Sequence, residues 1–168
     1  EAAHPRTRMV SLSHVEFASG QRHDIRAVGD FCRANHKLFC VDAIQTLGII
    51  PVDVRAMNID FLSADGHKWL LAPEGAGMFY VRKELHDQLR PLSVGWMNVI
   101  NAHDYGHYDF TLRDDAKRFD GGSYNIPGFL ALGAALELLL EIGLPTITAR
   151  VLGLTDQLAA GLAKKGYQ

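Results

Sequence analysis

An apolar strand that ends in a carboxylate is the feature that most constrains the fold of this chain. Residues 37–41 (Lys-Leu-Phe-Cys-Val) are apolar after the lysine and lead directly into Asp42. They follow residues 24–36, whose apolar positions recur at helical spacing, and a strand-like run at 9–14. Continuous apolar strands joined through a helix are typical of parallel sheets that are covered by helices. We therefore expect an α/β fold with a mostly parallel sheet flanked by helices.

The remaining elements alternate in the same way, apart from one long irregular segment. Further predicted elements are strands at 59–64 and 77–81 and helices at 83–88, 127–142 and 145–164. The last two helices are separated by Gly143, and each begins at a proline, which is favoured in a first helical turn. Residues 92–120 are rich in Gly, Asn, His and Tyr. A loop of this length is usually functional or packs on a partner.

Composition excludes several classes of function. Of 168 residues, 48% are apolar and 21% are charged, which suits one folded domain. The net charge of −2, with scattered basic residues, offers no footprint for nucleic acid or an anionic membrane. Two cysteines do not make a disulfide framework, and the apolar-rich segment 129–144 carries two glutamates and is too short to span a bilayer. We expect a cytoplasmic protein that binds a small molecule.

Polar residues follow three of the predicted strands at the point where each strand ends. These are Ser13-His14, then Asp42 to Gln45, and then the run Asp65-Gly66-His67-Lys68. Ligands of open parallel sheets bind beyond the carboxyl ends of the strands. The shared placement of the three clusters therefore predicts a binding site at one edge of the sheet.

Asp42 has two interpretations on local sequence. Its carboxylate would emerge at the sheet edge, where a partly desolvated charge needs a cation or several donors. The pattern Asp-x-x-Gln, which ends at Gln45, is also that of a helix N-cap with a capping box. Local sequence favours the cap, and both roles are compatible only if the carboxylate faces a ligand.

Lys68 is followed by the apolar run Trp69-Leu70-Leu71. Apolar neighbours disfavour the ammonium form and so free an amine for covalent catalysis, although most lysines are solvated surface residues. His67, taken alone, is more often a structural hydrogen-bonding residue than a catalyst. The chain lacks the spacings of zinc ligands, so we predict no metal site. It also lacks a Gly-x-Ser-x-Gly nucleophile motif and a phosphate-binding loop.

Three segments together resemble one enzyme family. They are 41–48 (Val-Asp-Ala-Ile-Gln-Thr-Leu-Gly), 60–77, which contains Ser-Ala-Asp-Gly-His-Lys-Trp-Leu, and 118–125 (Arg-Phe-Asp-Gly-Gly-Ser-Tyr-Asn). In this order and at these separations they resemble the class V aminotransferase family. That family is a branch of the fold-type I enzymes that depend on pyridoxal 5'-phosphate (PLP), and it includes cysteine desulfurases. The resemblance implies that the chain is a core piece of the PLP-binding large domain.

The resemblance also implies a role for each candidate residue. Lys68 would form the internal aldimine with PLP and then move protons at the substrate α-carbon. Asp42 would pair with the protonated pyridine nitrogen, and Gln45 would donate to the ring oxygen. His67 would lie near the phosphate or the imine. Ser123, which matches a threonine of the family, would reach the phosphate of the neighbouring subunit's cofactor, which implies a homodimer with shared active sites.

Two departures from the family pattern shape the expected reaction. Asp65 stands where the family often has a serine that binds phosphate, and Phe17 stands where its desulfurases commonly have asparagine. We therefore expect a class V aminotransferase-type enzyme acting on an amino-acid-like substrate. The alternatives are an enzyme of the cysteine desulfurase or selenocysteine lyase type and a non-catalytic fragment or degenerate relative.

The resemblance predicts a division of the chain. Residues 1–143 would form part of the PLP-binding large domain, and 144–168 a helix leading toward a C-terminal small domain that these residues do not include. The family's substrate-binding arginine and further phosphate-binding residues belong to other parts of its complete chains. We expect the 168-residue piece alone to be inactive.

Overall fold

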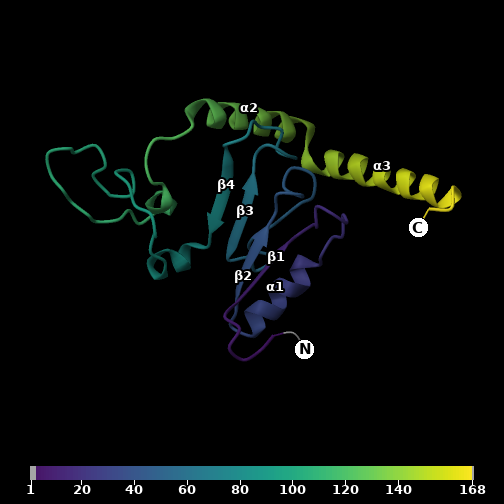
Figure 1. The fold of residues 1–168 in the computed structure, drawn as a ribbon, viewed down its shortest axis with the longest axis horizontal. Helices are drawn as coiled ribbons and strands as arrows, with labels where there is room; N and C mark the ends of the chain where they lie inside the picture. Colours follow the sequence, from purple (N-terminus) through teal and green to yellow (C-terminus); the bar gives the residue numbers. More distant parts are fainter. Residues whose placement is uncertain (1–2, 168) are drawn as a thin grey trace.

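The computed structural model describes residues 3–167, which form a small sheet with helices on one face and along one edge (Figure 1). The elements in chain order are β1 (Met9–Ser13), α1 (Ile25–Ala34), β2 (Leu38–Asp42), β3 (Phe61–Asp65), β4 (Gly77–Val81), the 3₁₀ helices η1 (Lys83–Gln88) and η2 (Ala116–Phe119), α2 (Ile126–Ile142) and α3 (Leu144–Lys164).

The sheet is mostly parallel, as predicted. Its four strands follow the order β1-β2-β3-β4. β1 pairs parallel with β2 and β2 pairs parallel with β3, whereas β4 returns antiparallel to β3. The carboxyl ends of the three parallel strands therefore meet at one edge, and α2 runs along that edge in Figure 1.

Helix α1 covers one face of the sheet. Asp24 caps the helix by accepting a hydrogen bond from the Ala27 backbone nitrogen at 3.0 Å. The helix buries Ile25 and Cys32 against the inward side chains of β2 and β3. Each large aliphatic or aromatic side chain buried in this way contributes about 1.5–3 kcal/mol to the free energy of folding. The buried cluster consists of Ile25, Cys32, Phe39, Val41, Ala43, Ile59, Leu62 and Ala64.

The opposite face of the sheet carries no α-helix within residues 3–167, but η1 and η2 pack on part of it through Leu85 and Phe119. Ser63 and Asp42 are exposed there, and Phe79 retains 57% of its accessible surface. Phe79 stacks on Phe61 at a centroid distance of 6.4 Å, so the face is partly apolar. A sheet flanked by helices was expected from the apolar strands, and α1 covers one face whereas η1 and η2 cover only part of the other.

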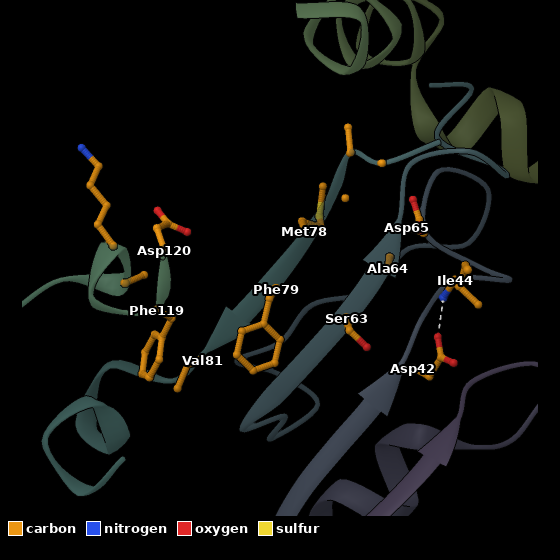
Figure 2. Close-up of a pocket in the computed structure, with 15 residues that line it drawn as sticks. Asp42, Ile44, Ser63, Ala64, Asp65, Met78, Phe79, Val81, Phe119 and Asp120 are labelled. Carbon is orange, nitrogen blue, oxygen red and sulfur yellow. Dashed lines mark hydrogen bonds between the residues drawn. The ribbon is translucent and has the colours of Figure 1, made fainter. Parts of the chain in front are cut away.

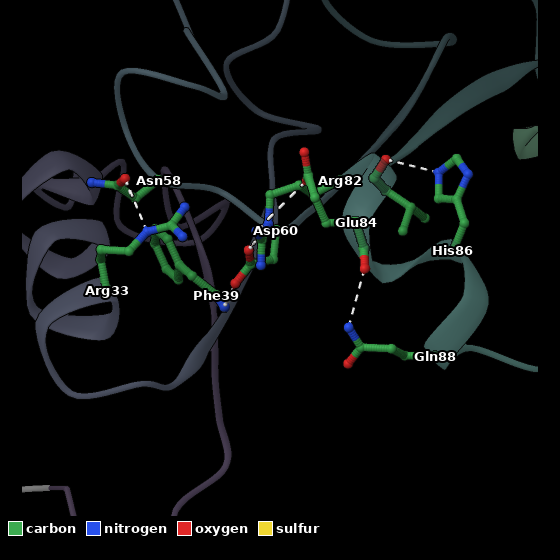
Figure 3. A network of polar contacts seen from close by, with 9 residues as sticks. Arg33, Phe39, Asn58, Asp60, Arg82, Glu84, His86 and Gln88 are labelled. Carbon is green, nitrogen blue, oxygen red and sulfur yellow. Dashed lines mark hydrogen bonds and ion pairs between the residues drawn. The ribbon is translucent and has the colours of Figure 1, made fainter.

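β3 begins at Phe61, later than predicted and directly after the buried carboxylate of Asp60 (Figure 3). Asp60 accepts hydrogen bonds from the Phe39 backbone nitrogen at 2.9 Å and from Arg82 Nε at 2.6 Å. Both carboxylate oxygens are thus satisfied although the residue is only 4% exposed. The Asp60 backbone nitrogen also donates to the Phe39 carbonyl oxygen at 2.9 Å, and the ladder to β2 starts one residue later, at Phe61.

Two long helices close the chain. Asn125 caps the start of α2, since its side chain accepts from the Gly128 nitrogen at 3.1 Å, and Gly143 with φ 87° follows the end of the helix. α3 then extends away from the sheet and buries none of its residues. Among the described residues no single helix has the length and composition of a membrane span. Taken together, α2 and α3 have that length and composition, but the two helices are bent by 82° relative to each other. The division at residue 143 into two domains stays a prediction.

Candidate functional site

The polar clusters at the ends of β1 and β2 are in direct contact. His14 donates its backbone N–H to the Asp42 carbonyl oxygen at 2.9 Å. Its Nδ1 lies 3.1 Å from the Thr46 hydroxyl, and both side chains are buried. Burial lowers the pKa of the His14 imidazole from its usual value, and the cation of Arg22 lowers it further. The lowered pKa favours a neutral imidazole, and this ring holds the segment after Asp42 through its contact with Thr46.

Asp42 ends β2 and is exposed. Its Oδ1 accepts a hydrogen bond from the Ile44 backbone nitrogen at 2.9 Å. Residues 44–49 form successive turns and no α-helix, so the capping-box interpretation with Gln45 is wrong. The short-range bond to Ile44 is an Asx-turn contact, which a following turn satisfies as well as a helix does. Within residues 3–167 the carboxylate forms no ion pair, which leaves it accessible to a cationic ligand.

The loop that carries Lys68 is closed by its own backbone. The Gly66 nitrogen donates to the Ala76 oxygen at 2.7 Å, and the Ala72 nitrogen donates to the Gly66 oxygen at 2.9 Å. Leu70, Ala72 and Ala76 are buried and pack against Leu132 of α2. Lys68 itself is half-buried. Of the three apolar residues after it, Leu70 is buried, whereas Trp69 and Leu71 are exposed.

Asp65 and His67 form an ion pair beside Lys68. His67 Nδ1 lies 3.2 Å from Asp65 Oδ1. The hydrogen bond from His67 and a second one from the Gly66 backbone hold the pKa of the Asp65 carboxyl below its usual value. Asp65 replaces a serine of the family pattern, and an anion next to a phosphate is unfavourable. The contact with His67 gives the Asp65 carboxylate a hydrogen-bond partner within its own loop.

The turn after Asp42 packs directly on the Lys68 loop. Gly48 has φ 101°, and a methyl group at this position would collide with the Trp69 carbonyl oxygen. Leu47 also packs on the buried cluster that contains Leu70. The fold thus brings together the Asp42 and Lys68 segments, which the sequence placed at the ends of neighbouring strands.

Replacing Gly48 with alanine should destabilise this junction. Positive φ costs an alanine about 1–2 kcal/mol, and the contact with the Trp69 carbonyl adds to that cost. We expect the full-length parent protein to lose at least about 2 kcal/mol in urea unfolding. Gly161 lies on α3 with open space around it, so Gly161→Ala should cause no loss. Equal stability of the two variants would contradict the close packing at Gly48.

A pocket of about 740 Å³ opens at the Asp42 edge of the sheet (Figure 2). Asp42, Ser63 and Asp65 lie along its β2–β3 side, and Phe119 and Asp120 lie across from them. The lysine among its lining residues is Lys117, which lies on η2. Lys117 is therefore the natural control for any role that is assigned to Lys68.

Gln45 lies on the other side of the same turn. It is half-buried and lines a separate pocket of about 400 Å³, together with Phe17 and Trp69. Helix α3 closes this second pocket through Val151 and Leu152. Asp42 and Gln45 thus open into different pockets around one turn, and their joint role at a cofactor ring stays a prediction.

Asn125 ties the Ser123 segment to the Lys68 loop. Its Nδ2 donates to the Gly75 oxygen at 3.0 Å, while its Oδ1 caps α2. Ser123 is exposed two residues earlier. The structural role of Asn125 was missed in the sequence, although an asparagine shortly before a proline is a signal for a helix start. The segment of Ser123 is therefore attached to the same loop that carries His67 and Lys68.

Comparisons with known proteins agree on one family. The model of the family described as aminotransferase class-V matches residues 1–167. A probable cysteine desulfurase of Methanothermobacter thermautotrophicus is 33% identical over 160 residues, which are 95% of this chain and 39% of that protein. The uncharacterized aminotransferase YcbU of Bacillus subtilis is 34% identical over 96% of this chain and 42% of its own length.

A solved structure extends the likeness to the fold. The apo cysteine desulfurase from Thermococcus onnurineus NA1 superposes with a TM-score of 0.84 at 30% identity, covering 94% of this chain and 38% of that one. The chain therefore spans well under half the length of the relatives that it matches.

Proposed function

This chain belongs to the aminotransferase class-V family, and on that premise we propose that it is part of a PLP-dependent enzyme that acts on an amino acid. The observation that carries the proposal is the contact between the turn after Asp42 and the loop of Lys68, made where Gly48 meets Trp69. It packs the segment that carries a carboxylate against the segment that carries an amine, and such a cofactor needs both groups.

Asp42 and Lys68 have the chemistry that suits this cofactor, whereas Gln45 opens into a different pocket from Asp42. An exposed carboxylate that forms no ion pair within residues 3–167 suits a protonated pyridine nitrogen, and Asp42 is such a group. Lys68 would hold the cofactor covalently and carry a proton to or from the substrate α-carbon. Gln45, His67 and Ser123 would contact the ring oxygen, the imine or phosphate, and a neighbouring subunit's phosphate. When bound, PLP supplies an electron sink for bonds broken at the α-carbon.

Cysteine desulfuration is the reaction that the relatives support best. Two of the similar proteins, one of them a solved structure, are named cysteine desulfurases. This reaction breaks the carbon–sulfur bond of cysteine, transfers the sulfur to an acceptor thiol and leaves alanine. Cys32 is buried and burial raises the pKa of its thiol, so it is a poor nucleophile. Cys40 is half-buried in β2 and packs against the cluster of Phe61, Val81 and Leu85. The acceptor would therefore be a thiol outside residues 3–167.

Transamination is the second candidate. The observation that favours it is Phe17, which occupies the place of an asparagine in the desulfurase pattern and is 84% exposed beside the pocket of Gln45. An apolar side chain there cannot supply the hydrogen bonds of an amide. The similarity to a protein named as an aminotransferase is in keeping with this reading.

The two reactions are separated by their products. The full-length parent protein, loaded with PLP, would be incubated with L-cysteine and a thiol reductant, and separately with amino donors and an α-keto acid. We expect sulfide and alanine in equal amounts from the first mixture. If the second mixture gives new keto acid and the first gives no sulfide, the result would contradict desulfuration and support transamination. A folded protein that binds no PLP would contradict both reactions and favour a non-catalytic relative.

A further inference from the structure

The irregular segment before η2 contains a tightly built turn at residues 95–98. Asn98 is fully buried at its centre. Its side-chain oxygen accepts from the Gly95 nitrogen, and its Nδ2 donates to the Arg118 carbonyl oxygen at 2.7 Å. The Asn98 carbonyl oxygen accepts from the Arg113 nitrogen at 2.9 Å. One side chain thus joins the turn to η2, the helix that immediately precedes the Gly121–Ser123 segment.

The same turn touches that segment directly. A methyl group on Gly95 would collide with the Gly121 carbonyl oxygen. The Met97 nitrogen approaches this oxygen at 3.5 Å, and a methyl group on Gly122 would lie 3.3 Å from Trp96 Nε1. The contact between residues 95 and 121 is therefore made by two backbones, and a larger residue at position 95 would push residue 121 away.

The segment that carries Ser123 depends on such external contacts. Residues 121–124 form no helix or strand, and Gly121 and Gly122 have no side chains with which to fix their backbone. On its C-terminal side the segment is held by the hydrogen bond from Asn125 to the Gly75 carbonyl oxygen. On its N-terminal side, at Gly121, it is held by the turn at 95–98. Ser123 is therefore held between two attachment points.

We propose that Asn98 is a positioning residue that acts through Ser123. By holding the 95–98 turn against Gly121, Asn98 fixes the position and orientation in which the Ser123 hydroxyl can donate a hydrogen bond to a phosphate. A hydroxyl held in place gives tighter binding because its ordering cost is met on folding. This inference rests on the proposed function, in which Ser123 binds the cofactor phosphate of a neighbouring subunit.

A double-mutant cycle on PLP affinity tests the inference in the full-length parent protein. The dissociation constant of PLP would be measured for the parent, Asn98→Ala, Ser123→Ala and the double variant. Loss of one hydrogen bond to a charged phosphate weakens binding about tenfold. We expect about tenfold from each single variant and no more than about threefold beyond Ser123→Ala in the double variant, because the two residues act on one contact.

Controls separate positioning from general stability. Tyr108→Ala changes a fully exposed side chain of the same segment and should leave the dissociation constant unchanged. Asn98→Asp, which keeps the shape and the acceptor but loses the donor to Arg118, serves if Asn98→Ala does not fold. The inference is overturned if Asn98 variants lose thermal stability but keep PLP affinity, or if the two effects multiply to about a hundredfold.

Failure of the inference and failure of the proposed function give different results. A parent protein that does not bind PLP contradicts the proposed function, and the inference with it. A Ser123→Ala variant with unchanged PLP affinity removes the role of Ser123 and overturns the inference while leaving Lys68 and Asp42 in place. A weakened Ser123→Ala variant beside an unaffected Asn98→Ala variant overturns the inference alone.

Discussion

Lys68→Ala in the full-length parent protein is expected to abolish covalent attachment of PLP and to lower turnover by about 10³-fold or more. The amine of Lys68 would be both the point of attachment and the group that moves the proton, so one substitution removes two functions. The fold should persist, because the loop is held by backbone hydrogen bonds of Gly66 and Ala72 and by buried Leu70. Turnover and borohydride-fixed cofactor would be measured together.

Lys117→Ala is the matched control for this substitution. Lys117 lines the same pocket as Asp42, which makes it the competing lysine on geometry alone. We expect Lys117→Ala to keep the attached cofactor and to change turnover only slightly. If Lys117→Ala loses the attached cofactor and Lys68→Ala keeps it, the roles of the two lysines are reversed.

Asp42→Asn is expected to give the second largest effect, a loss of about 10²–10³-fold in turnover. The amide oxygen can still accept the hydrogen bond from the Ile44 nitrogen, so the turn should form and thermal stability should change little. The negative charge that would stabilise the protonated pyridine is lost. Catalysis should therefore fall far more than stability, which would be measured by steady-state kinetics and thermal unfolding.

Asp53→Asn provides a control with the same local geometry. Asp53 Oδ1 accepts from the Arg55 and Ala56 nitrogens, each at 2.9 Å, in a turn away from the site. If Asp42 served only its own turn, the two asparagine variants would behave alike. A large loss of turnover in Asp42→Asn and none in Asp53→Asn is the expected result.

Much of the fold could be predicted from the sequence because its signals are local. The strands at 9–14 and 77–81 and both closing helices follow from apolar periodicity and from prolines at helix starts, and the structure confirms them. The meeting of the three polar clusters follows from the parallel order of the strands. The contact of Asp65 with His67 was not predicted, although it joins near neighbours in sequence.

The contacts that could not be predicted join residues distant in sequence. Nothing near Gly48 indicates that its missing side chain makes room for the Trp69 carbonyl, because that contact depends on how two loops pack. Asn98 reads as one more polar residue of an irregular segment, yet it is fully buried. The antiparallel return of β4 is invisible for the same reason, since apolar spacing carries no strand direction.

The most direct test of the account is to map the modified residue in the full-length parent protein. The protein would be loaded with PLP, reduced with borohydride, digested, and its peptides sequenced by mass spectrometry. We predict one modified lysine, Lys68, and an absorbance band that disappears on reduction. Modification at Lys117 or another lysine, or the absence of any modified peptide from a folded protein that takes up PLP, would contradict the assignment of the site.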